Sequence, residues 1–157
     1  MRVGFGYDIH PLTKDRSLII GGVHIPYEKG LKGHSDADVM AHAVADALLG
    51  AAGLGDIGEH FPDSDQKYKN YDSMLLLQEV ERELSFEKLR ISNIDITLVL
   101  QEPKISAYKS AMKKNIAKNL FINTEQVNVK ATTGEGLGFV GRSEGAVCYA
   151  VALLLPR

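Results

Sequence analysis

Apolar side chains recur at every second position in parts of the chain, which is the spacing of a half-buried strand. The clearest case is residues 91–100, where Ile94, Ile96, Leu98 and Leu100 lie two residues apart. Turn-forming glycines, such as the pair at positions 21 and 22, separate shorter extended segments. The pattern predicts strands at residues 2–10, 17–20, 23–25, 91–100, 127–132 and 146–155.

Three further segments have the spacing and the terminal residues of helices. The first is expected to begin at a cap formed by Ser35 or Asp36 and to end near Gly53. The second is expected at residues 72–89. The third follows Pro103, which suits the first turn of a helix, and its four lysines form either a solvated face or a grip for phosphates.

The last predicted strand is apolar on both of its faces. The residues of one face are Val147, Tyr149, Val151 and Leu153, and those of the other are Ala146, Cys148, Ala150 and Ala152. Three helices can cover only one face of a sheet, so we expect the other face to pack on neighbouring subunits. The predicted fold class is α+β, with one mixed β-sheet and helices packed on one face.

Composition limits the classes of protein to consider. A chain of 157 residues has the size of one domain, so we expect residues 1–157 to fold as a single domain. Its 45% hydrophobic and 24% charged residues are typical of a globular protein and argue against a disordered or fibrous chain. A net charge of −2 provides no overall field that attracts nucleic acid, so an anionic ligand must be held by local groups.

The single cysteine, Cys148, rules out a disulfide framework and a thiolate zinc cluster, so any metal must use histidines and carboxylates. No apolar run reaches the roughly 18 residues of a membrane helix. Residues 1–7 resemble a strand rather than a signal peptide. We therefore expect a cytoplasmic protein without a membrane partner.

Two histidines and an aspartate are candidates for a metal site. Asp8 and His10 are two residues apart on a predicted strand, so both side chains leave the same face and can bind one ion. His42 lies on the first predicted helix between Asp38 and Asp46, whose carboxylates could orient its imidazole. Such a ligand set leaves a fourth position open, as in catalytic zinc sites. The Asp-x-His spacing alone also fits ordinary polarity at a strand end.

Three other segments could bind an anionic substrate. His34 and Ser35 precede the first helix, where free backbone N–H groups attract phosphate, although Ser35 with Asp38 also fits a simple helix cap. Residues 132–142 combine hydroxyls, glycines, an acid and an arginine, and could enclose phosphate oxygens or could be a mobile strand connection. The polar loop at 56–65 could accept hydrogen bonds from hydroxyls or could be only a turn.

These pieces, in this order, resemble the 2-C-methyl-D-erythritol 2,4-cyclodiphosphate synthases of the non-mevalonate isoprenoid pathway. The resemblance begins with Gly6-Tyr7-Asp8-Ile9-His10 and extends nearly to the end of the chain. The other matching motifs lie at residues 20–23, 25–27, 33–39, 46–50, 55–58, 61–63, 102–104, 127–133, 137–139 and 141–142. So many motifs at matching spacing make the resemblance specific.

The resemblance implies a reaction in which the 2-phosphate of 4-diphosphocytidyl-2-C-methyl-D-erythritol 2-phosphate attacks the β-phosphate of the same molecule, forming the cyclodiphosphate and CMP. It also implies zinc bound by Asp8, His10 and His42, and a second cation, Mg²⁺ or Mn²⁺, bound by Glu135. The groups implied to steady the transition state are His34 and Thr133. The implied substrate contacts are Asp8, His10, His34, Ser35, Asp56, Ile57, Gly58, Phe61, Pro62, Asp63, Ser64, Asp65, Leu100, Gln101, Glu102, Pro103, Lys104, Ile105, Ser106, Thr132, Thr133, Gly134, Glu135, Phe139 and Arg142.

The same resemblance implies a homotrimer with active sites between subunits and with sheets that face one another. It leaves open a physical association with other enzymes of the pathway. Gly134, Gly136 and Tyr149 depart from the family pattern, in which Asn or Thr, Lys and Glu are common at these positions. We expect the loop around Gly134 to rely more on backbone contacts.

Two other functions share part of this pattern. A non-haem iron oxygenase also binds its metal through two histidines and one carboxylate, but such enzymes favour all-β barrels rather than a fold with three helices. A trimeric binding module could hold a metal for stability alone. Release of CMP from the diphosphocytidyl substrate would distinguish the synthase from both.

Overall fold

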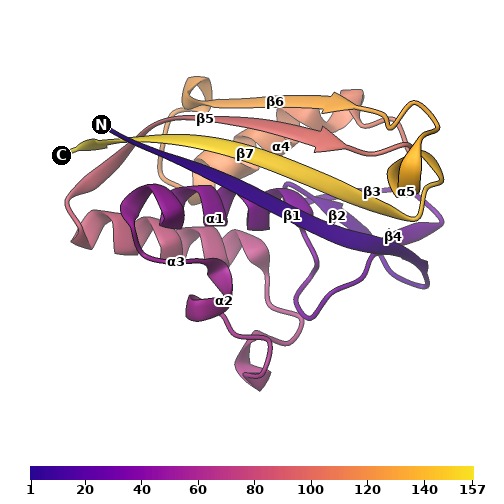
Figure 1. Cartoon of the computed structure of the whole chain (residues 1–157), viewed down its shortest axis with the longest axis horizontal. Coiled ribbons are helices and arrows are strands. Elements are labelled where there is room, and N and C mark those ends of the chain that lie inside the picture. The colour runs from indigo at the N-terminus through magenta and orange to yellow at the C-terminus, as the bar shows by residue number, and fades with distance from the viewer.

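The computed structural model describes residues 1–157, and a five-stranded sheet with helices on one face dominates it (Figure 1). The strands lie in the order β4-β1-β7-β5-β6. Their bounds are Arg2–Lys14 for β1, Lys29–Leu31 for β4, Leu89–Val99 for β5, Val127–Thr132 for β6 and Gly145–Pro156 for β7. Only β5 and β6 are parallel, so the sheet is mixed, as predicted. A separate hairpin consists of β2, Leu18–Ile20, and β3, Val23–Ile25.

The three main helices cover one face of the sheet, which confirms the predicted fold class (Figure 1). They are α1 at Val39–Ala52, α3 at Ser73–Phe86 and α4 at Lys109–Asn119. Two short helices, α2 at Ile57–His60 and α5 at Gly138–Gly141, lie in connections, as do the 3₁₀ turns at Gln66–Tyr68, Ser106–Tyr108 and Thr124–Gln126. None of the helices is long and apolar enough to span a membrane.

Two glycines allow β1 to lie unusually close to α1. A Cβ added at Gly4 or at Gly6 would lie 1.9 Å from a backbone oxygen of α1, so any side chain there would push the helix away. Alternate residues of a strand share a face, so Asp8 and His10 continue the row that Gly4 and Gly6 begin. The close packing of strand and helix therefore brings these two polar side chains against the start of α1.

The opposite face of the sheet is apolar and exposed in the single chain. On β1, which pairs with β7 at these positions, Phe5 is 63% exposed and Tyr7 is 45% exposed. The Tyr149 ring lies beside both of them, with its centroid 5.5 Å from that of Tyr7. Alternate residues of β7 on the helix side, such as Cys148 and Ala150, are buried. The two apolar faces predicted for this strand are thus confirmed.

The helix start predicted at Ser35 or Asp36 is wrong. Helix α1 begins at Val39, and its N-cap is Asp38, whose side chain accepts hydrogen bonds from the amides of residues 40 and 41. Ala37 has φ = 57°, a left-handed conformation that a continuing α-helix cannot include.

Two other expected boundaries also differ from the structure. Pro103 does not begin a helix: α4 begins only at Lys109, and the peptide bond before Pro103 is cis. The second helix ends at Phe86 rather than at position 89, because Lys88 has φ = 57° and β5 begins directly after it.

Candidate active site

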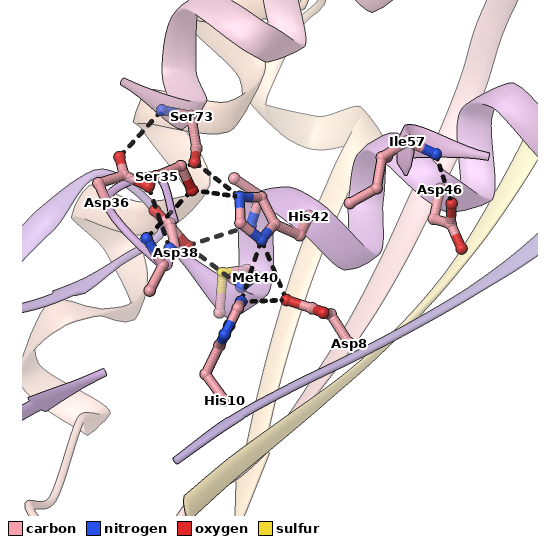
Figure 2. Close-up of polar contacts among 12 residues, drawn as sticks. Asp8, His10, Ser35, Asp36, Asp38, Met40, His42, Asp46, Ile57 and Ser73 are labelled. Atoms are coloured by element: carbon pink, nitrogen blue, oxygen red, sulfur yellow. Dashed lines mark hydrogen bonds and ion pairs between the residues drawn. The ribbon is translucent and has the colours of Figure 1, made fainter. Parts of the chain in front are cut away.

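Asp8, His10 and His42 converge at the place where β1 meets the start of α1 (Figure 2). One oxygen of Asp8, Oδ2, lies 2.9 Å from Nε2 of His10 and 3.1 Å from Nδ1 of His42. The two ring nitrogens are 3.2 Å apart. The predicted convergence of these three residues, which we call the metal cluster, is confirmed.

The metal cluster has the chemistry and the spacing of a divalent cation site. Tetrahedral zinc with bonds of about 2.0–2.2 Å has ligand atoms roughly 3.3–3.6 Å apart. The observed separations of 2.9–3.2 Å are only slightly shorter, so a small outward shift accommodates an ion. Two imidazole nitrogens and one carboxylate leave a coordination position for a substrate oxygen.

The outer nitrogen of each ring has a hydrogen-bond partner of its own. Nδ1 of His10 lies 3.1 Å from the backbone oxygen of Lys32. Nε2 of His42 lies 2.9 Å from the hydroxyl oxygen of Ser73 and 3.1 Å from that of Ser35. These contacts orient the rings so that the remaining nitrogens face Asp8.

The charges of the cluster also act on one another. Burial favours the neutral form of Asp8, but hydrogen bonds and positive charge from His10 and His42 outweigh it and lower the pKa of this carboxyl. Burial likewise opposes the charged form of His42, but the hydrogen bond and charge of Asp8 raise the pKa of this imidazole. The cluster therefore favours positive charge beside Asp8, as a cation would supply.

The sequence-based role of Asp38 and Asp46 is wrong. Asp38 is fully buried and accepts hydrogen bonds from the amides of Gly21 and Gly22 at 2.9 and 2.7 Å, besides capping α1. Asp46 accepts a hydrogen bond from the amide of Ile57 at 3.1 Å. Backbone amides thus donate hydrogen bonds to both carboxylates, and Ser35 and Ser73 contact the imidazole of His42 instead.

The helix amides expected to lie free beside His34 and Ser35 are not there, because α1 begins later and the side chain of Asp38 caps its first amides. Binding of phosphate beside His34 and Ser35 stays a prediction. Ser35 turns its hydroxyl to His42. The ring of His34 instead lies 3.4 Å from the backbone oxygen of Asp65.

A cleft of about 470 Å³ opens beside the metal cluster. Most of its lining residues were expected to contact substrate, namely Asp8, His10, His34, Ser35, Ile57, Gly58, Phe61, Pro62 and Asp63. Four other lining residues were not expected from the sequence, namely Gly33, Tyr68, Tyr71 and Leu76. Tyr68 stacks edge-on against Phe61 and Tyr71. Nothing in the spacing of these tyrosines indicates that they would meet at the cleft.

A second cavity of about 260 Å³ lies between the end of β5, the end of β6 and the start of α4. The expected substrate contacts that line it are Leu100, Gln101, Pro103, Lys104, Ile105, Ser106, Thr132 and Thr133. Lys109, one of the four lysines for which a grip on phosphates was left open, and Ala131, which was not predicted, complete its lining. The two cavities share no residue.

Eight of the expected contacts line neither cavity, namely Asp56, Ser64, Asp65, Glu102, Gly134, Glu135, Phe139 and Arg142. Asp56 caps α2, and Asp65 caps the 3₁₀ turn that follows. Arg142 pairs with Glu144 at 2.8 Å. Glu135 is not part of the metal cluster, and its carboxylate lies 3.3 Å from the hydroxyl of Thr133.

Comparisons with known proteins identify the family to which the chain belongs. The model of the YgbB family matches residues 1–155. The 2-C-methyl-D-erythritol 2,4-cyclodiphosphate synthase of Alkaliphilus metalliredigens is 59% identical over 151 residues, which cover 96% of this chain and 95% of the relative.

Two solved structures are similar over 99% of this chain. The bifunctional IspDF of Campylobacter jejuni has a TM-score of 0.96 and 46% identity, and this chain covers 42% of it. The CDP complex of Plasmodium falciparum IspF has a TM-score of 0.87 and 35% identity, with 96% of that chain covered. Because the family model and the relatives match nearly the whole chain, the protein belongs to the YgbB family of 2-C-methyl-D-erythritol 2,4-cyclodiphosphate synthases.

Proposed function

We propose that this protein converts 4-diphosphocytidyl-2-C-methyl-D-erythritol 2-phosphate into 2-C-methyl-D-erythritol 2,4-cyclodiphosphate and CMP. The observation that carries the proposal is the convergence of Asp8, His10 and His42 beside a cleft large enough for a phosphorylated small molecule. The name of the A. metalliredigens relative supplies the product. The CDP bound to the P. falciparum relative supports a cytidine nucleotide as part of the ligand.

The reaction needs no nucleophile from the protein. An oxygen of the substrate's 2-phosphate forms a bond to the β-phosphorus, and the bond from that phosphorus to the bridging oxygen breaks, so the electron pair leaves with CMP. The protein must hold these groups in line and stabilise the charge that develops on the phosphoryl oxygens. Zinc bound by the metal cluster would supply a Lewis acid for the β-phosphate.

We assign roles to the residues of the two cavities on this basis. His34 lines the cleft and can donate a hydrogen bond to a phosphate oxygen. Thr133 lies at the second cavity, and its hydroxyl can do the same. Glu135 offers a carboxylate for Mg²⁺ or Mn²⁺ bound to the diphosphate. Residues 56–65 would contact the methylerythritol and ribose hydroxyls, and residues 100–106 would hold the cytosine.

The assembly is part of the proposal. A substrate with a methylerythritol phosphate at one end and cytosine at the other needs both cavities, but different residues of one chain line them. The exposed apolar face of β1 and β7 supports a homotrimer in which a neighbouring subunit completes each site. Residues 1–157 would act as one domain, and the cytoplasm is the proposed location.

The test compares Thr133→Ala and Glu135→Gln with the unchanged protein. Thr133→Ala should lower kcat by about 10²-fold with zinc content intact, because a donor aimed at developing charge acts chiefly in the transition state. The Glu135→Gln variant should release CMP slowly. Added magnesium or manganese should increase its rate only weakly, because one anionic ligand of that ion is lost.

Assays of CMP release and metal analysis provide the measurement. Glu125→Gln is the matched control, because it makes the same change at an exposed residue outside both cavities. Full activity of Glu135→Gln with an unchanged magnesium requirement would overturn the role of Glu135. Substrate binding without CMP release by the unchanged protein would favour a binding module over a synthase.

A further inference from the structure

A chain of hydrogen bonds links Asp36 through Ser73 to the outer ring nitrogen of His42 (Figure 2). We propose that Asp36 and Ser73 are positioning residues that keep the His42 proton on Nε2, so that Nδ1 is free to bind the divalent cation. The proposal deepens the proposed function and rests on the metal cluster that this function requires.

The direction of the chain follows from what each group can donate. The carboxylate of Asp36 can only accept, and three donors point at it: the hydroxyl of Ser73, the amide of Ser73 at 2.9 Å and the amide of Asp38 at 3.1 Å. The hydroxyl proton of Ser73 is thus committed to Asp36. Its oxygen can then only accept from His42, so Nε2 must carry the proton.

His10 shows the same arrangement with a different partner. Its Nδ1 lies 3.1 Å from the backbone oxygen of Lys32, which cannot donate, so this nitrogen carries the proton and Nε2 faces the cluster unprotonated. A metal binds the unprotonated nitrogen of a neutral imidazole. Both rings therefore present an unprotonated nitrogen to a cation beside Asp8. Only the tautomer of His42 depends on side chains, which a mutation can remove.

Ser35 is a weaker candidate for the same role. Its hydroxyl oxygen lies 3.1 Å from Nε2 of His42 and also accepts from the amide of Ala37 at 3.3 Å. No carboxylate accepts a hydrogen bond from this hydroxyl, so Ser35 can support the ring without fixing its tautomer. Ser73 is completely buried at the first turn of α3, which holds its hydroxyl in place.

The test measures zinc affinity by competition with a chelator, without substrate. Ser73→Ala should weaken zinc binding by about 10–100-fold, the usual effect of removing the partner of a metal-binding histidine. Ser35→Ala should have a smaller effect. Ser85→Ala is the matched control, because it removes a hydroxyl from the same helix, where Ser85 contacts Glu81 rather than the cluster.

A second readout separates positioning from simple loss of stability. In ¹⁵N NMR spectra of the metal-free protein, the neutral His42 ring should carry its proton on Nε2, and Ser73→Ala should produce a mixture of tautomers. If Asp36 acts through Ser73, the zinc affinity of the double variant Asp36→Ala/Ser73→Ala should equal that of Ser73→Ala. If either alanine variant fails to fold, zinc affinity is measured instead on Asp36→Asn, which keeps an acceptor oxygen.

Unchanged zinc affinity and an unchanged tautomer in Ser73→Ala would overturn the proposal, even if that variant melted at a lower temperature. An additive loss in the double variant would also overturn the linked action of the two residues. The proposed function can fail separately. If the protein binds zinc through this tautomer but releases no CMP, the roles of Asp36 and Ser73 stand and the synthase function is contradicted.

Discussion

Asp8 lies between the two imidazole rings and controls the charge of the metal cluster. Without a cation, the raised pKa of His42 and the lowered pKa of Asp8 show that the pair stabilises the folded chain as an ion pair. A proton on Nδ1 of His42 occupies the position that a cation needs. Protons and divalent cations should therefore compete for this nitrogen.

This competition predicts how pH affects stability. Asp8 contributes stability above its unfolded pKa of 3.8, and the contribution is lost as pH falls through its lower folded pKa. His42 contributes stability below its unfolded pKa of 6.5, and the contribution is lost as pH rises through its higher folded pKa. The ion pair thus stabilises the metal-free protein most between these two unfolded values, and this stabilisation is lost at strongly acidic and at alkaline pH.

The stabilisation by zinc should have the opposite trend. The difference between the Tm values of the zinc-loaded and metal-free protein should increase from about pH 6 to about pH 8, because fewer protons compete for His42. Calorimetry at both pH values measures it, with His42→Ala as the control that should show little difference at either. A constant difference in Tm across this range would contradict the competition.

The site could be predicted where one element or one spacing decides the geometry. Asp8 and His10 share a face because strands have a period of two, so their pairing follows from the sequence. The roles of Asp36 and Ser73 could not be predicted, because they arise only when the starts of two helices meet. The four-residue spacing between Asp38 and His42 predicts a contact that does not form, because backbone amides donate to the Asp38 carboxylate instead.

At the scale of elements, the loop from 133 to 136 is held by Gln101, which follows the end of β5. The side-chain oxygen of Gln101 accepts hydrogen bonds from the amides of Gly134 and Gly136 at 3.2 and 3.4 Å. A Cβ at Gly134 would lie 2.7 Å from the amide nitrogen of Gly141, so the loop is folded too tightly for a side chain there. Gly134 therefore fits a loop whose shape depends on backbone contacts.

Gln101→Ala should lower kcat/KM by roughly 5–30-fold, because about 1–2 kcal/mol of loop-holding interaction is lost. Zinc content should not change, because the metal cluster lies on other elements. Gln101→Glu keeps an acceptor oxygen and should retain most of the activity. Gln126→Ala is the control, since Gln126 also bonds backbone groups, but those of β5. Full activity in Gln101→Ala would contradict this role of the side chain.

The type of each main element could be predicted better than its ends. Alternating apolar residues mark β5, and the residues predicted for β6 are those observed. The ends depend on single residues in unusual conformations, such as Ala37 and Lys88 with positive φ, which no periodic pattern reveals. The cis peptide bond before Pro103 likewise has no signal in one sequence, since most bonds before proline are trans.

At the scale of the whole molecule, the sheet presents an unpartnered apolar surface formed by Val3, Phe5, Tyr7, Ile9, Tyr149 and Val151. Large exposed apolar patches usually mark interfaces. The metal cluster is complete within one chain, whereas the two cavities that the proposed substrate needs are lined by separate residues. Assembly should therefore be required for turnover but not for metal binding.

A variant that cannot assemble can test whether turnover, but not metal binding, requires the trimer. Light scattering of the unchanged protein should give the mass of a trimer at concentrations where CMP is released. Phe5→Asp should dissociate it, because a charge without a partner is costly to bury in an apolar interface. The variant should lose most of its CMP release while still binding zinc. Phe86→Asp is the matched control, because Phe86 is 82% exposed at the end of α3, on the helix side of the sheet. A monomeric Phe5→Asp variant with full activity, or a stable active monomer of the unchanged protein, would show that one chain completes the site alone.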